Sequence, residues 1–437
     1  MKHRVKLGVI CLARKTFDYN AALEIYEKKQ SELSKRIDIE FVFYPGLVIE
    51  VEDAKKAAQE LLKHDVDAYI CISGTFHLGH LVLEIQKKLQ KPVLLWGWNE
   101  LPYNGGKIRL NSVCGVNLNA SNLYKSGIKN YQVVVGENLD ENWIDAIRII
   151  SRYSNAHVGL IGYRAHGFFN LGVYDLNVYK ELGILIDHYE LDDLYHMAVS
   201  DTEIQEQIKE VKEIFDCSGI TEDQVLKVAT LTVKMSHFVK LHKVDALAVR
   251  CWPEFAANFG ISPCAAMSIL QSKGLILSCE GDVEGALSML AHQAIGAETP
   301  YLFDFSQVNF EEDYALLWHC GVAPCNLWNK KCTRSLDTYF AGGKGVTADF
   351  VLKSGELSIF RMDSAGTDIR LFVQKATAVD MEKELRGTYA KAVFDEGVQA
   401  VLDRVVENGV AHHASLVYGD FIKPFEILGK IKNWRII

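Results

Sequence analysis

The sequence lacks the features that mark several large classes of protein. Its ten cysteines include no CxxC pair, and several lie inside apolar runs, which fits buried free thiols better than disulfides or a zinc knuckle. The net charge is −9, whereas a nucleic-acid-binding protein usually carries a basic face. No apolar run approaches the roughly 18 residues of a membrane span. We therefore expect a cytoplasmic protein with neither a nucleic acid nor a membrane as its partner.

A secretory signal is also not expected. Basic residues precede an apolar run at the N-terminus, as they do in a signal peptide. The run LGVICLA is short, however, and Arg14 and Lys15 follow it directly. We interpret it as the first β-strand of the fold.

The chain alternates apolar strand patterns with helical patterns up to about residue 305. The first series has expected strands at VKLGVICLA, IDIEFVFYP, VDAYICI and KPVLLWGW, and expected helices at 19–35, 51–64 and 77–89. A second series begins at HVGLIGYRA, after a polar stretch at 151–155, and continues through VDALAVRCW, GLILSC and TPYLFDF. Helices between apolar strands favour parallel sheets with right-handed crossovers.

The pattern changes after residue 328, where short strands follow one another without intervening helices. ADFVLK, LSIFRMD and IRLFVQKA favour an antiparallel, β-rich region, which helices near 392–408 and 421–430 complete. We predict three domains, at 1–153, 154–328 and 329–437. The first two are doubly wound parallel-sheet α/β domains, and the third is a smaller β-rich domain.

Two acids attract notice because each closes a short apolar run of the second series. Glu280 ends GLILSCE and Asp304 ends TPYLFD, with a helical pattern at 284–296 between them. A strand–helix–strand unit of this size predicts neighbouring parallel strands, whose carboxyl ends bind ligands in open α/β sheets. Downstream, His413 precedes another short apolar strand. Two carboxylates and an imidazole around one pocket would form an oxygen-rich divalent metal site.

Most candidate residues also have a structural interpretation. Asp282 suits the N-cap of the following helix better than a catalytic role. Glu254, near the carboxyl end of a strand, fits a solvated loop acid at least as well as a substrate contact. His319 lies in an apolar setting, where a hydrogen-bonded core histidine is the commoner outcome. Of His412 and His413, one is a ligand or substrate contact and the other is structural or exposed, because adjacent strand residues point to opposite faces.

Polar and aromatic residues near the carboxyl ends of predicted strands are candidates for substrate binding. Such residues occur in GYRAHGFFN and CWPEF of the second series and in SGTFHLGH of the first. The predicted substrate-binding residues, including a histidine from LWHCG, are Phe76, His77, Arg164, His166, Trp252, Glu254 and His319.

The motifs CEGDVEGALSML, TPYLFDF and HHASLVYGD together resemble those of the L-fucose isomerase / L-arabinose isomerase family of aldose–ketose isomerases. The spacing of the two acids resembles the fucose isomerase branch. The resemblance implies that Glu280, Asp304 and His413 bind Mn²⁺, with Co²⁺ or Mg²⁺ as alternatives, and that the two acids are catalytic. It also implies a homo-oligomer, with a hexamer favoured, whose sites are shared between subunits.

The chemistry of aldose–ketose interconversion suits these residues. A proton moves between C1 and C2 while the carbonyl group shifts. In the enediol route a divalent cation stabilises the charge that grows on the sugar oxygens, and flanking carboxylates shuttle protons. A hydride shift would use the same metal. We predict a metal-dependent isomerase whose partner is a small-molecule sugar.

Two other functions stay open. One is isomerisation of a C6-modified hexose, for example a sulfonated one such as sulfoquinovose, for which Arg164 or Arg361 could bind the extra group. The other is a non-catalytic sugar-binding protein built on paired α/β domains.

Overall fold

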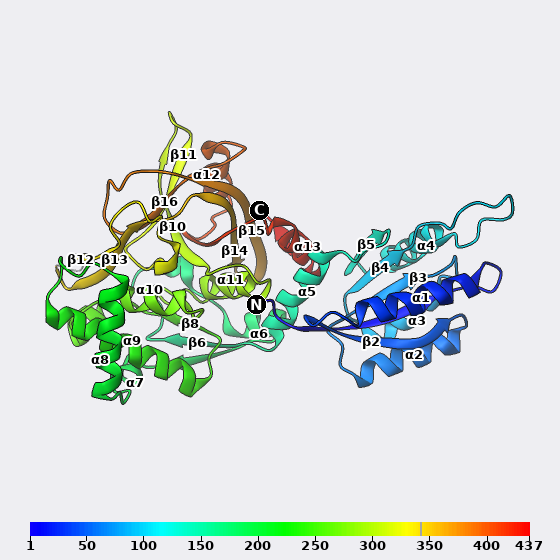
Figure 1. Ribbon diagram of the computed structural model, residues 1–437, viewed down its shortest axis with the longest axis horizontal. Coiled ribbons are helices and arrows are strands. Elements are labelled where there is room, and N and C mark those ends of the chain that lie inside the picture. Colours follow the sequence, from blue (N-terminus) through cyan, green and yellow to red (C-terminus); the bar gives the residue numbers. More distant parts are fainter. Residues whose placement is uncertain (341–342) are drawn as a thin grey trace. The chain divides into compact units, whose positions relative to one another are not determined.

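The computed structural model describes residues 1–340 and 343–437, and within them the chain divides into two compact units (Figure 1). The first unit consists of residues 2–151 and 423–434, and the second consists of residues 152–422 with both chain ends. The strands of these described residues form two parallel sheets and one mixed, β-rich sheet. The predicted fold class is therefore confirmed, while the three domain boundaries stay a prediction.

The first unit is built on a parallel sheet in the order β2–β1–β3–β4–β5. Its strands are β1 (Val5–Leu12), β2 (Ile39–Val48), β3 (Ala68–Ser73), β4 (Val93–Gly97) and β5 (Tyr131–Val135). Its helices are α1 (Tyr19–Leu33), α2 (Val51–Lys63), α3 (His80–Leu89), α4 (Ser112–Lys125) and most of α5 (Glu141–Ser154) and α13 (Ile422–Lys432). The apolar N-terminal run is strand β1, as predicted, and nearly all of its residues are buried.

The second unit begins with a smaller parallel sheet in the order β7–β6–β8–β9. Its strands are β6 (His157–Ile161), β7 (Leu185–Tyr189), β8 (Ala246–Val249) and β9 (Ile276–Ser278). The unit's helical elements are η1 (Phe169–Leu171), α6 (Asp175–Leu182), α7 (Leu191–Tyr195), α8 (Asp201–Ile214), α9 (Glu222–His242), η2 (Phe255–Phe259), α10 (Cys264–Ser272), α11 (Val283–Ala294), η3 (Cys325–Leu327) and α12 (Val398–Glu407). None of the helices within residues 1–340 and 343–437 is long and apolar enough to cross a membrane.

The mixed sheet has the order β12–β13–β16–β11–β10–β17–β14–β15–β18. Its strands are β10 (Tyr301–Asn309), β11 (Tyr314–His319), β12 (Ser335–Phe340), β13 (Gly345–Val351), β14 (Gly355–Ala365), β15 (Asp368–Val379), β16 (Thr388–Val393), β17 (His413–Tyr418) and β18 (Arg435–Ile436). An additional pairing of β15 with β16 closes the strands from β16 through β15 into a ring. Closure satisfies backbone groups that an open edge would leave unpaired.

Helix α11 connects the small parallel sheet to this ring. It contacts β8 and β9 on the parallel sheet and β14 and β17 on the mixed sheet (Figure 1). Almost every residue of α11 is buried, as expected of a helix that is covered on all sides. Its small residues Gly285, Ala286 and Ala291 are among the buried ones.

The predicted parallel pairing of the strands that carry Glu280 and Asp304 is wrong. β9 lies at the edge of the parallel sheet, whereas β10 pairs antiparallel with β11 and β17 in the mixed sheet. Asp304 also lies inside β10, which continues to Asn309. The strand–helix–strand pattern is the same for a crossover within one sheet and for a helix that connects two sheets, so the pattern alone could not separate them.

Candidate active site

Glu280 lies in a strained turn between β9 and α11. Both Glu280 and Gly281 have positive φ angles, of 63° and 73°. A β-carbon at position 281 would lie 2.4 Å from the carbonyl oxygen of Tyr163, so only glycine fits there. The N–H of Ala165 donates to the carbonyl oxygen of Glu280 at 2.8 Å and fixes the turn. A non-glycine residue in the left-handed region costs free energy, and such residues cluster at functional sites.

The strand register of the ring brings an acid and two histidines together. Asp304 on β10 is the cross-strand partner of His413, the first residue of β17. On its other side Asp304 is paired with Trp318, which precedes His319 at the end of β11. Because β11, β10 and β17 are adjacent, their three polar side chains can reach one point beside Glu280.

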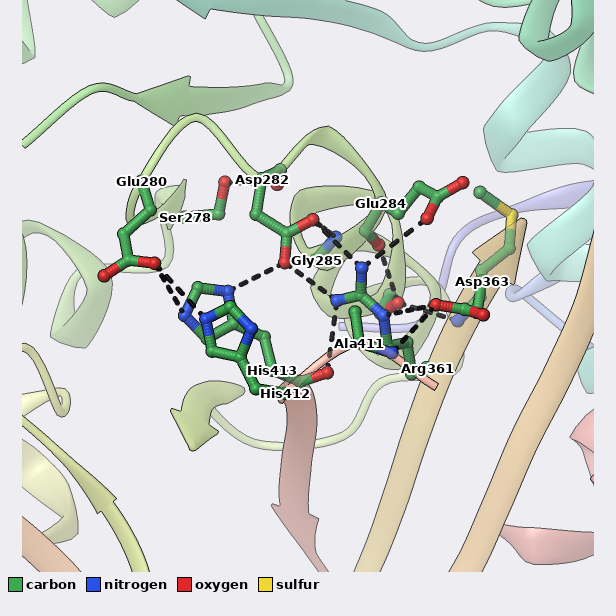
Figure 2. Close-up of polar contacts among 12 residues, drawn as sticks. Ser278, Glu280, Asp282, Glu284, Gly285, Arg361, Asp363, Ala411, His412 and His413 are labelled. Carbon is green, nitrogen blue, oxygen red and sulfur yellow. Dashed lines mark hydrogen bonds and ion pairs between the residues drawn. The ribbon is translucent and has the colours of Figure 1, made fainter. Parts of the chain in front are cut away.

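His413 is at the centre of the resulting cluster. Its Nε2 is 3.2 Å from Oδ1 of Asp304 and 3.6 Å from Oε2 of Glu280. The same Glu280 oxygen is 3.4 Å from Nε2 of His412 (Figure 2). Among the described residues, two overlapping groups have ligand atoms close enough to hold one ion: Glu280, His412 and His413, and Asp304, His319 and His413. The predicted ligands are thus brought together, and their role as ligands stays a prediction.

Neighbouring charges set the ionisation of each group. Burial alone would lower the pKa of His413, but its contacts with the carboxylates of Asp282 and Asp304 outweigh burial and raise the pKa to about 10. Burial opposes ionisation of Asp304, yet His319 and His413 lower its pKa to about 2. The pKa of Glu280 is also lowered, because contacts with His412 and His413 outweigh its burial. At neutral pH both carboxylates are therefore ionised.

Three buried atoms of the cluster have no well-formed hydrogen bond among the described residues. They are Nε2 of His413, Nε2 of His319 and Oδ1 of Asp304. A buried polar atom without a partner costs free energy, so native proteins usually supply an ion, a water molecule or a ligand. Carboxylate oxygen and imidazole nitrogen are ligands that Mn²⁺ and similar divalent cations accept. The residues present therefore fit a divalent cation.

His319 offers a proton donor, rather than a lone pair, at the cluster. The backbone N–H of Cys320 donates to its Nδ1 at 2.9 Å, so Nδ1 is unprotonated. Burial lowers the pKa of His319, which keeps the ring neutral and leaves its single proton on Nε2. An N–H group at this position can donate to a sugar oxygen, as expected of the substrate contact that was predicted here.

A cavity of about 200 Å³ lies beside the cluster. Glu280, Asp304 and His319 form its ionisable wall. The remaining lining residues are aromatic, sulfur-containing or small: Phe168, Trp252, Trp318, Cys251, Cys264, Cys320 and Ser262. Aromatic walls beside a few convergent polar groups are typical of a small-ligand pocket. Trp252 and His319 thus line the cavity, and their contacts with substrate stay predictions.

The loop after β6 carries two other predicted contacts. The Arg164 guanidinium packs over the rings of Tyr163 and Phe169 and donates to the Tyr163 hydroxyl at 3.0 Å. His166 is exposed to solvent. Neither residue is among those that line the cavity in the described chain, so their contacts with substrate stay predictions.

Three further predicted contacts have other protein partners. Glu254 forms an ion pair with Arg250 at 2.6 Å. Phe76, in the first unit, packs on Phe17 with 5.7 Å between ring centroids. His77 is fully buried in the same unit, where its Nε2 is 3.1 Å from the Ser73 hydroxyl. Glu254 is not among the described residues that line the cavity, and the binding roles of all three residues stay predictions.

Sequence reasoning missed a buried charge network behind His413. Asp282 caps α11 as predicted, because it accepts from the Gly285 N–H at 2.9 Å. It also accepts from Nδ1 of His413 at 2.9 Å and from Nη1 of Arg361 at 2.8 Å (Figure 2). The interpretation of Asp282 as a cap was therefore correct but incomplete.

Arg361 is fully buried and lies among carboxylates. Besides Asp282, it pairs with Asp363 at 3.1 Å and with Glu284 at 3.5 Å. The suggestion that Arg361 binds a group on the substrate is therefore wrong, because its guanidinium is already enclosed. The available signal was an arginine inside the apolar strand LSIFRMD, since a buried charge requires buried partners.

Known proteins resemble the chain along nearly its whole length. The sequence profile of the fucose/sulfoquinovose isomerase N-terminal domain matches residues 8–146. Sulfoquinovose isomerases from Priestia aryabhattai and Priestia megaterium are each 29% identical over 435 residues, which cover 97% of this chain and 96% of theirs. A sulfoquinovose isomerase from Alkalicoccus urumqiensis is 26% identical over 439 residues, 98% of this chain and 97% of its own. These matches support the resemblance of the chain to fucose isomerase-like proteins.

The matches confirm the resemblance predicted from the motifs, and the chain is an aldose–ketose sugar isomerase. The similarity extends beyond the N-terminal region that the profile matches, because the relatives also cover the unit with Glu280, Asp304 and His413. Among solved structures, a solute-binding protein from Agrobacterium vitis with bound allitol is 14% identical, with a TM-score of 0.18 over 68% of this chain and 88% of that chain. That likeness is too weak to support an argument.

Proposed function

We propose that this isomerase interconverts a hexose sulfonated at C6 and the corresponding ketose, using a divalent metal ion held by Glu280, Asp304 and His413. The observation that carries the proposal is the convergence of these three side chains beside the cavity. The buried atoms of His413 and Asp304 that lack a well-formed hydrogen bond support the metal, with Mn²⁺ as the first choice. The printed names of the relatives support the sulfonated substrate.

The residues around the cavity match the needs of the reaction. Glu280 and Asp304 are ionised at neutral pH, so either can accept a carbon-bound proton from the sugar. The Nε2–H of His319 can donate to a sugar oxygen. When bound, a divalent cation would act as a Lewis acid and stabilise negative charge on the adjacent sugar oxygens. The proton that leaves one carbon returns to its neighbour, so the reaction needs no external oxidant or reductant.

A sulfonate group requires a cation, and we assign this role to Arg164. The lining of the cavity contains neither lysine nor arginine among the described residues. Arg164 is next to Ala165, which bonds the Glu280 turn, and on the same loop as Phe168, which lines the cavity. A guanidinium presents several donors in one plane, which suits an oxyanion.

A panel of sugars tests the substrate. The isomerase would be assayed with Mn²⁺ on sulfoquinovose, on glucose, which has a hydroxyl in place of the sulfonate, and on L-fucose and L-arabinose. We expect kcat/KM for the sulfonated hexose to exceed that for glucose by at least ~10²-fold, because an uncharged analogue leaves the site's polar groups unpaired. Equal kcat/KM values would reject the sulfonated substrate while leaving the isomerase activity in place.

Removal of the metal tests the cofactor separately. Treatment with a chelator followed by dialysis should abolish turnover, and added Mn²⁺ should restore it. Co²⁺ and Mg²⁺ are the alternatives to compare. Full activity in a preparation shown to be metal-free by elemental analysis would reject the metal site.

We also propose a homo-oligomer, with a hexamer favoured, as the family resemblance implies. Light scattering coupled to size-exclusion chromatography measures the mass directly. A fully active monomer would reject this assembly.

A further inference from the structure

The network behind His413 suggests how that histidine is prepared for metal binding. We propose that Asp282, fixed by Arg361, is a positioning residue that leaves Nε2 of His413 free to bind the metal ion. The inference rests on the metal site of the proposed function. Asp282 itself is not one of the proposed ligands.

The contact between Asp282 and His413 determines which ring nitrogen carries the proton. Oδ2 of Asp282 is 2.9 Å from Nδ1 of His413, and both side chains are fully buried. A carboxylate that is paired with an arginine only accepts hydrogen bonds, so the proton in this contact is on Nδ1. A neutral imidazole then has its lone pair on Nε2, the atom near Asp304 and Glu280.

Arg361 holds both partners of this contact. Its Nη1 donates to Oδ2 of Asp282 at 2.8 Å and to the backbone carbonyl oxygen of His413 at 3.1 Å. Its Nη2 donates to Oδ1 of Asp282 at 3.3 Å. One planar guanidinium therefore fixes the carboxylate and the backbone of the histidine that the carboxylate orients (Figure 2).

Every partner of the Asp282 carboxylate in this network is a donor. Oδ1 accepts from the Gly285 N–H and from Arg361, and Oδ2 accepts from Arg361 and from His413. In Asp282→Asn the amide nitrogen would face a donor in either orientation. If it faces His413, Nδ1 must accept and the ring proton moves to Nε2, where it blocks the metal. If it faces Gly285, the cap and one contact with Arg361 are lost.

Asp363 offers a matched control within the same network. It is also buried, and its Oδ1 accepts from Nε of Arg361 at 3.1 Å and from the Ala411 N–H at 3.2 Å. Its Oδ2 accepts from Nη2 of Arg370 at 2.6 Å. Asp363 therefore resembles Asp282 in three respects: it is buried, it pairs with Arg361, and all of these partners are hydrogen-bond donors. None of its hydrogen bonds in the described chain reaches the ring of His413.

Titration calorimetry with Mn²⁺ on the metal-free full-length protein distinguishes a role of Asp282 in orienting His413 from a role in the stability of the fold. We expect Asp282→Asn to weaken Mn²⁺ binding about 10- to 100-fold, the usual effect of removing a residue that orients a ligand. Asp363→Asn should lower the melting temperature to a similar extent and keep an affinity near that of the wild type. Wild-type affinity in Asp282→Asn, or equal weakening in Asp363→Asn, would overturn the positioning role. A wild type that binds no Mn²⁺ would instead reject the proposed metal site.

A second measurement needs no variant at position 282, in case Asp282→Asn does not fold. Nitrogen-15 NMR of histidine-labelled wild type, loaded with diamagnetic Mg²⁺, reports the protonation of each ring nitrogen. Comparison with His413→Gln assigns the signals of His413. We expect a protonated Nδ1 and an unprotonated Nε2. A protonated Nε2 in the Mg²⁺-loaded protein would overturn the inference.

Discussion

Two fully buried histidines, His77 in the first unit and His413 in the second, differ in their charge. His77 has Nε2 3.1 Å from the Ser73 hydroxyl and 3.3 Å from the Asn119 amide nitrogen, and burial lowers its pKa to about 4. His413 is equally buried, yet it lies between carboxylates, which raise its pKa to about 10. His77 is therefore neutral at pH 7, whereas His413 is cationic unless a metal ion replaces its proton.

The difference shows that the partners of a buried histidine indicate a functional site. Its burial and its position next to a strand do not. Both residues were selected from the sequence because they lie next to a short apolar strand. Neutral partners leave His77 with a complete set of hydrogen bonds inside its own unit. Carboxylate partners give His413 a charge that a cation can replace.

The largest expected effect is on catalysis at the charged cluster. Glu280→Gln and Asp304→Asn each remove a charge and a base while keeping the shape of the side chain. We expect each to lower kcat by at least ~10²-fold, the lower limit for loss of general acid–base catalysis. The control is Glu298→Gln, whose exposed carboxylate pairs with Lys353 at 2.9 Å. Steady-state kinetics with saturating Mn²⁺ measures the loss, and normal turnover in both site variants would show that the wrong carboxylates were assigned.

Replacement of each histidine by glutamine tests the comparison directly. His413→Gln should remove detectable Mn²⁺ binding, because it deletes the residue shared by both groups of candidate ligands. His77→Gln should keep the Mn²⁺ affinity of the wild type, because its partners are Ser73, Asn119 and a backbone carbonyl. Titration calorimetry on the two folded variants measures both affinities. Equal losses would mean that burial, and not the charged partners, is the relevant property.

The sequence predicted the cluster better than it predicted the path of the chain to it. Glu280, Asp304 and His413 were recognisable because each places a polar side chain beside a short apolar run. Their convergence was expected from parallel neighbours in one sheet. It arises instead from a cross-strand pair, Asp304 with His413, and from the turn that precedes the N-terminus of α11. Short apolar runs do not distinguish parallel from antiparallel pairing, so this part of the fold could not be derived.

The residues that orient the ligands were harder to predict than the ligands. Asp282 satisfied a complete local interpretation as a helix cap, and nothing near it in the sequence indicates Arg361 or His413. The pocket residue Phe168 is also distant in sequence from the acids that it accompanies. Such contacts depend on which strands become neighbours, and a single sequence does not specify that.

A smaller effect is expected at the proposed sulfonate contact. Arg164→Gln removes the guanidinium charge, and loss of a charge-assisted hydrogen bond should raise KM for the sulfonated hexose about tenfold. Turnover at saturation should change little. Arg386→Gln is the control, since this exposed guanidinium also packs over a tyrosine ring, that of Tyr339. An unchanged KM in Arg164→Gln would leave the sulfonate without its assigned partner.

A further expected effect, on stability rather than on catalysis, is an acid dependence at His77. Its pKa is about 4 in the folded chain and 6.5 as the ordinary value. The unfolded chain therefore binds the proton more readily, so acid favours unfolding. The stabilisation is fully present above pH 6.5, is lost as the pH falls from 6.5 towards about 4, and changes no further below that. The shift corresponds to a loss of up to about 3 kcal/mol.

Hydrogen exchange followed by mass spectrometry, corrected for the intrinsic effect of pH, measures this loss in peptides that cover β3 and α4. In the wild type, protection of these peptides should decrease between pH 6.5 and 4. His77→Gln keeps an amide that can bond Ser73 and Asn119 but has no group that titrates in this range. At pH 6.5 the protection of these peptides should be lower in the variant than in the wild type. It should also vary less with pH, because the variant lacks the group that binds the extra proton on unfolding. An equally steep pH dependence in both proteins would show that His77 is not the titrating group, and the contrast with His413 would then rest on hydrogen bonding alone.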